Sequence, residues 1–210
     1  MHPEFDLSPA AHALADIVAA IDDAQLDAPT PADIPVRALI EHVDGLAEAF
    51  RAAATKEASG ASAAPEFGSG ESLPGDWRTS VPARLSALAR AWQESAAWEG
   101  DTEAGGVAMP APVTARVALD ELVIHAWDLA RATGQDLKVN DADLAVLLEF
   151  LQDTPAEGTP GLFGPVVPMG PAAPAVHRVL GFTGRDPFWI PSARSTCTAP
   201  RHSADPARPV

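Results

Sequence analysis

Residues 116–129 read RVALDELVIHAWDL, and this stretch decides how the chain folds. Successive residues of a helix turn by about 100°, so Glu121 and His125 project from one face, one turn apart. Asp128 returns to nearly the same line, whereas Asp120 lies off it. Apolar residues flank the three polar side chains, which indicates a helix with polar groups in the middle of its apolar stripe. Burying such groups without partners costs free energy, so we expect them to meet other polar groups.

A second amphipathic helix is predicted over residues 35–58, and it carries the first candidate partner. Its apolar stripe is formed by Leu39, Val43, Leu46 and Phe50. His42 lies on the apolar half of this helix, and the small residues Gly45 and Ala49 leave room in front of the imidazole. If the two helices are neighbours in a bundle, His42 can face Glu121 and His125 across the core.

The remaining pattern predicts an all-α protein. Four long helices are expected over residues 7–26, 35–58, 81–98 and 113–132, followed by shorter helices over 141–151 and 175–182. Gly134 supplies a stop for the fourth helix. The glycine- and proline-rich connections predict no strand. We therefore expect a four-helix bundle with long connections and a small C-terminal helical extension over residues 1–190, followed by a disordered tail over 191–210.

Composition excludes several classes of function. The chain has 210 residues, a formal net charge of −15 and 47% hydrophobic residues, as expected of a folded acidic protein. Such a charge repels phosphate backbones and anionic lipids, so we expect neither a nucleic-acid partner nor a membrane partner. No apolar run is long enough to span a bilayer, and residues 1–10 lack the pattern of a signal peptide, so we expect a cytoplasmic protein. The sequence does not fix an oligomeric state.

Two imidazoles and one carboxylate form a plausible set of metal ligands. Three protein ligands with one open position are typical of catalytic zinc, although nickel, iron or manganese would accept the same atoms. Asp128 is the candidate catalytic residue: it could hold the tautomer of His125, with Arg131 as its tether, and it is the one evident general base. A di-metal site needs Glu-x-x-His, and Ile124 occupies that position. The alternative reading is that His42 and His125 are ordinary core residues.

Several motifs together resemble a known family. They are QLDAPTP at 25–31, VRALIEHV at 36–43, DELVIHAWDLARATG at 120–134, FGP at 163–165 and GFTGRDP at 181–187. These stretches resemble the metal-binding domain of the mycothiol-dependent maleylpyruvate isomerase group, which belongs to the DinB/YfiT-like superfamily of metalloenzymes. The resemblance covers roughly residues 10–190. It implies a DinB-like four-helix bundle with a divalent metal, usually zinc, at one end, and its ligand pattern matches His42, Glu121 and His125.

The resemblance also implies a chemistry. The isomerase carries a further α/β domain, and we expect that domain to be absent here because the stretch after Gly134 is short and rich in proline and glycine, so this chain resembles the shorter branch of the group. We expect a metal- and mycothiol-dependent enzyme, or one using a similar thiol, that transfers the thiol to a small electrophile or isomerises it. Cys197 stands alone in the expected tail, so the thiol must come from a cofactor. The alternatives are a non-catalytic metal- or small-ligand-binding bundle and a purely structural, partner-binding bundle.

Overall fold

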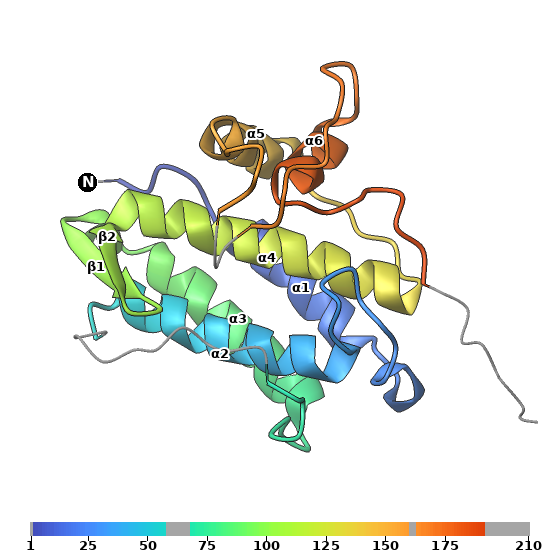
Figure 1. Ribbon diagram of the computed structural model, residues 1–210. Coiled ribbons are helices and arrows are strands. Elements are labelled where there is room, and N and C mark those ends of the chain that lie inside the picture. The colour runs from blue at the N-terminus through green and yellow to red at the C-terminus, as the bar shows by residue number, and fades with distance from the viewer. Residues whose placement is uncertain (1, 58–67, 160–162, 192–210) are drawn as a thin grey trace, which may run out of the picture.

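The computed structural model describes residues 2–57, 68–159 and 163–191, and it confirms the predicted all-α class. Four helices run side by side as a bundle (Figure 1): α1 (Ser8–Ala19), α2 (Val36–Ala54), α3 (Trp77–Trp92) and α4 (Ala111–Thr133). Each of α1 and α2 packs against both α3 and α4, so the helices form a closed ring around one apolar core. No helix among the described residues is long and apolar enough to cross a bilayer.

Two short helices form the C-terminal extension. Helix α5 (Asp141–Leu151) packs on α4, and α6 (Ala175–Phe182) packs on α5, so the extension lies on the outer side of α4 (Figure 1). The bounds of α6 agree with the sequence prediction. Beyond residue 191, the predicted tail and Cys197 fall outside the described residues.

The predicted bounds of two helices, α1 and α3, are wrong. Helix α1 ends at Ala19, and the chain then forms a separate short 3-10 helix, η1 (Asp23–Gln25). Helix α3 begins before the predicted start and ends at Trp92, after which η2 (Ser95–Trp98) turns Trp98 back onto the core. The indole nitrogen of Trp98 donates to the Trp92 carbonyl at 2.7 Å. The Trp92 carbonyl therefore accepts a side-chain hydrogen bond where a longer helix would have supplied a backbone one.

The prediction that the chain has no strands is also wrong. Strands β1 (Asp101–Ala104) and β2 (Val107–Pro110) pair antiparallel in a small hairpin at one end of the bundle (Figure 1). Gly105 and Gly106 form its turn, both with positive φ, which is the conformation that a two-residue hairpin turn requires and that glycine adopts readily. The buried Thr102 hydroxyl donates to the Ala53 carbonyl at 2.5 Å, which fixes the hairpin to the end of α2.

Helix α4 is more deeply buried than an amphipathic pattern suggests. It lies between α1 and α2 on one side and α5 on the other, so several of its polar residues are buried as well as its apolar stripe, namely Thr114, Asp120, His125 and Asp128. Asp120, which the helical projection placed off the stripe, is only 3% exposed. Burial, reinforced by the charge of Glu121, raises the pKa of Asp120 well above its ordinary value. Gly134 ends the helix with a φ of 72°, as predicted.

A buried carboxyl at the start of α5 makes the stability of the fold depend on pH. Asp143 is 4% exposed, and burial together with the charge of Asp6 raises its pKa from 3.8 to about 6. The folded protein therefore binds the proton more tightly than the unfolded chain, and this contribution to stability is lost as pH rises through about 6. We expect Asp143→Asn to raise the free energy of unfolding at pH 7.5 by about 1–2 kcal/mol.

Denaturant unfolding between pH 4 and 8 checks this prediction. The neutral amide should flatten the pH dependence of the free energy of unfolding between pH 4 and 7. Asp141→Asn, at the exposed first position of the same helix, is the matched control and should change stability by less than about 0.5 kcal/mol. An Asp143→Asn protein with the wild-type pH profile would contradict the prediction.

Candidate metal centre

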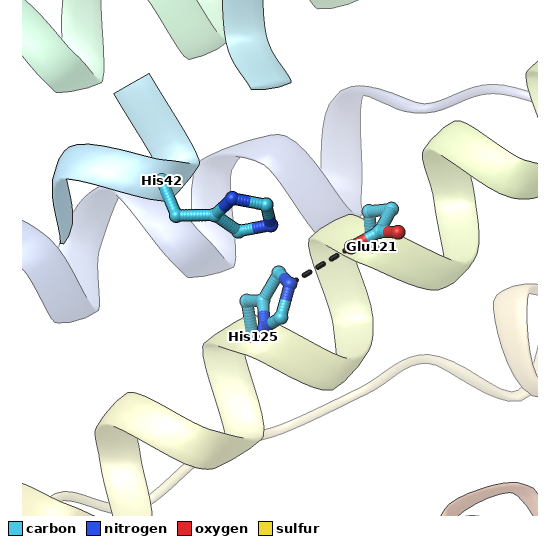
Figure 2. A group of neighbouring side chains, drawn as sticks. All are labelled: His42, Glu121 and His125. Atoms are coloured by element: carbon cyan, nitrogen blue, oxygen red, sulfur yellow. Dashed lines mark ion pairs between the residues drawn. The ribbon is translucent and has the colours of Figure 1, made fainter. Parts of the chain in front are cut away.

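Two neighbouring helices bring three side chains to one point. His42 projects from α2, and Glu121 and His125 project from consecutive turns of α4 toward it (Figure 2). One possible ligand atom from each residue lies within 4.8 Å of the other two. The two imidazole rings meet edge to face, with centroids 5.2 Å apart and an interplanar angle of 86°. The sequence prediction that α2 and α4 would turn these residues toward each other therefore agrees with the structure.

The three residues differ in their access to solvent. His42 and His125 are buried, with exposures of 7% and 3%. The side chain of Glu121 is 22% exposed, so the carboxylate forms the open edge of the group. Glu121 also lines a small crevice that reaches the bundle interior and is otherwise apolar: its other lining residues are Leu14, Val43, Leu46, Ala47, Phe50, Leu85, Leu88, Ala118 and Leu122. Glu121 is therefore the member of the group that is most open to solvent.

His125 lies between two carboxylates, and each of its two ring nitrogens faces a different one. Its Nε2 is 2.8 Å from Glu121 Oε2, and its Nδ1 is 3.3 Å from Asp128 Oδ2. Burial by itself lowers the pKa of this imidazole, but its contacts with Asp128 and Glu121 outweigh burial and raise the pKa to about 9. Without another cation, the pocket therefore favours a protonated His125. The same arrangement of negative charge suits a metal ion in place of that proton.

The donor set fits a divalent metal. Bonds of about 2.0–2.1 Å to tetrahedral zinc require ligand atoms about 3.4 Å apart, which small side-chain rotations can reach from the observed spacing. Two neutral imidazoles and one carboxylate would leave a 2+ ion with a local charge of about +1 and an open coordination position. His42, Glu121 and His125 are thus the residues that could hold the ion.

Asp128 lies behind His125, on the side away from Glu121. Its side chain is fully buried, and Arg185 binds both of its oxygens: Nε donates to Oδ1 at 3.0 Å and Nη2 donates to Oδ2 at 2.9 Å. Burial raises the pKa of Asp128, but its contacts with His125 and Arg185 outweigh burial and hold that pKa below 3.8. Asp128 is therefore an ionised hydrogen-bond acceptor for His125.

Sequence reasoning assigned the tether of Asp128 to the wrong arginine. Arg131 instead donates through Nη2 to the Trp189 carbonyl at 2.5 Å, and Arg185 makes the contact with Asp128. Helical spacing could not reveal Arg185, because 57 positions separate it from Asp128. The one available signal was the GFTGRDP motif at 181–187, which contains this arginine.

Comparison with known proteins supports the family resemblance. A family model described as the mycothiol maleylpyruvate isomerase N-terminal domain matches residues 7–130. No curated protein and no solved structure matches the chain significantly. The matched region includes all three candidate ligands and Asp128, and it ends before α5, α6 and Arg185.

Proposed function

This chain belongs to the mycothiol maleylpyruvate isomerase N-terminal domain family, and from that premise we propose that it is a divalent-metal-dependent enzyme that uses mycothiol or a similar thiol. The proposed reaction is transfer of the thiol to a small electrophile, or its reversible addition to isomerise a double bond. The observation that carries the proposal is the convergence of His42, Glu121 and His125, with Glu121 at the open edge. Zinc is the proposed ion, because two imidazoles, a carboxylate and an open position suit it.

Each part of the site has a role in this chemistry. A bound divalent ion would supply the positive charge that favours the thiolate, which is the nucleophilic form of a thiol. His42, Glu121 and His125 would hold that ion, and Glu121 also lines the crevice. Asp128 keeps a proton on Nδ1 of His125 and thereby directs Nε2 toward the site. Because Asp128 is fully buried and bound to Arg185, we assign it a positioning role without contact with the substrate.

The crevice favours an uncharged electrophile. Its one charged lining residue is Glu121, and no lysine or arginine lines it. Apart from the proposed ion, whose remaining charge the bound thiolate would neutralise, an anionic group would find no cation there and its desolvation would be costly. In the test reaction, the thiol sulfur forms a bond to the benzylic carbon of p-nitrobenzyl chloride, the carbon–chlorine bond breaks, chloride leaves with the electron pair, and the thiol proton goes to solvent.

The test is a conjugation assay with purified protein, mycothiol and p-nitrobenzyl chloride. We expect turnover above the uncatalysed rate with zinc-loaded protein, loss of turnover with a chelator, and recovery when zinc is restored. The isosteric but anionic p-chloromethylbenzoate should give a lower kcat/KM. Faster conjugation of the anionic compound would contradict the proposed substrate preference but not the proposed enzyme class.

A non-catalytic metal-binding bundle is the second candidate. The burial of Asp128 favours it, because the one general base that the sequence offered is enclosed and ion-paired. Under this alternative, the protein binds zinc with the same three residues but shows no chelator-sensitive conjugation. The assay above, together with a zinc determination on the same sample, separates the two candidates.

A further inference from the structure

The chain that follows α6 returns to α4 at the level of the candidate metal centre. Helix α6 ends at Phe182, and Gly184 then adopts a φ of 79°, which reverses the direction of the backbone. The Arg185 amide donates to the Leu180 carbonyl at 2.9 Å, closing this turn. A Cβ atom at Gly184 would lie only 3.0 Å from the backbone of Gly164, so the turn is tightly packed. The backbone thus fixes the position from which the Arg185 side chain starts.

The Arg185 side chain makes its shortest hydrogen bonds to one buried carboxylate, and its Nη1 also donates to the Thr183 carbonyl at 3.4 Å. Both bonds to Asp128 are short, and the two side chains are 17% and 0% exposed. This fork-to-fork geometry fixes the plane of the carboxylate as well as neutralising its charge. Without Arg185, the buried Asp128 carboxylate would keep only its contact with His125, and the loss of one partner of a buried ion pair is strongly destabilising.

The Asp128 carboxylate, oriented by Arg185, in turn faces the imidazole of His125, which is one of the three candidate metal ligands. Asp128 Oδ2, which accepts from Arg185 Nη2, is also the oxygen that lies 3.3 Å from Nδ1 of His125. The other ring nitrogen is the one beside Glu121. We propose that Arg185 is a positioning residue for the metal centre, which through Asp128 fixes the orientation and tautomer of His125 so that Nε2 is available to the ion.

This inference rests on the proposed function, because it requires the three residues to bind an ion. It adds a part of the chain to the site that the family match does not include, since the match ends at residue 130. The C-terminal extension would then complete the metal centre, in addition to covering α4. Loss of such an outer hydrogen-bond partner typically weakens metal affinity by about 10- to 100-fold.

The experiment measures zinc affinity by competition with a chromophoric chelator, and thermal stability in parallel. We expect Arg185→Ala to weaken zinc binding by about 10- to 100-fold. Arg185→Lys keeps the charge but cannot form both bonds, and it should give an intermediate affinity. Arg178→Ala, which removes an arginine of α6 that does not contact Asp128, should bind zinc as the wild type does.

A double variant separates positioning from mere stabilisation. Asp128→Leu combined with Arg185→Met replaces the buried ion pair by apolar side chains, which should restore much of the stability lost in Arg185→Ala. If Arg185 acts by positioning, zinc affinity in this variant stays at least about tenfold below wild type, because His125 lacks its partner. Recovery of wild-type affinity along with stability would overturn the inference.

The remaining outcomes are equally decisive. Wild-type zinc affinity in folded Arg185→Ala overturns the inference and leaves the proposed function intact. If Arg185→Ala does not fold, the zinc affinity of Arg185→Lys becomes the test, and a wild-type zinc affinity in that variant overturns the inference. A wild-type protein that binds no zinc overturns the proposed function, and the inference with it.

Discussion

Replacement of His42 by alanine should leave the protein folded but nearly free of zinc. His42 is the sole candidate ligand from α2, so its loss leaves two ligands on one helix, and two ligands hold zinc much more weakly than three. We expect the zinc affinity to fall by about a hundredfold or more. Conjugation activity should fall with it. Metal analysis after purification without added metal, followed by competition titration, measures the effect.

The controls for this variant are available in the same chain. His12→Ala removes an exposed histidine of α1 and should purify with wild-type zinc content. Glu121→Gln and His125→Ala should reproduce the loss seen for His42→Ala. Full zinc occupancy in His42→Ala would remove the site assignment, whatever the activity of the protein.

Replacement of Trp98 by alanine should have the largest effect on stability. Trp98 is fully buried, and its ring meets Phe5 and Trp92 edge to face at 5.0 and 5.6 Å. Its indole nitrogen also donates to the Trp92 carbonyl at 2.7 Å. Truncation creates a large cavity and leaves that carbonyl without its partner, so we expect a loss of about 3–5 kcal/mol in the free energy of unfolding.

Denaturant unfolding of matched variants checks this second prediction. Trp98→Phe keeps an aromatic ring but loses the donor, and it should cost less than the alanine variant. Phe188→Ala removes a ring that is 68% exposed and should change stability by less than about 0.5 kcal/mol. Equal stabilities for Trp98→Ala and Phe188→Ala would mean that Trp98 does not hold the end of the bundle to the N-terminal segment.

The sequence predicted helices best where a periodic apolar stripe ended at a strong stop. Gly134 ends α4 as expected, and the bounds predicted for α6 agree with the structure. The pattern failed where tertiary contacts compete with helix continuation, as at Trp98. It also failed at the hairpin turn of Gly105 and Gly106, because short strands carry few residues from which to detect alternation.

Some features of the candidate site could likewise be predicted from the sequence, and others could not. The sequence by itself determined that Glu121, His125 and Asp128 share one helical face, because helical periodicity is local and does not depend on what surrounds the helix. Only the tertiary structure decided that His42 meets Glu121 and His125, that Asp120 is buried, and that Arg185 binds Asp128. These contacts join residues far apart in the chain. They depend on which helices become neighbours, and that is settled by the packing of the whole core, which no local pattern records.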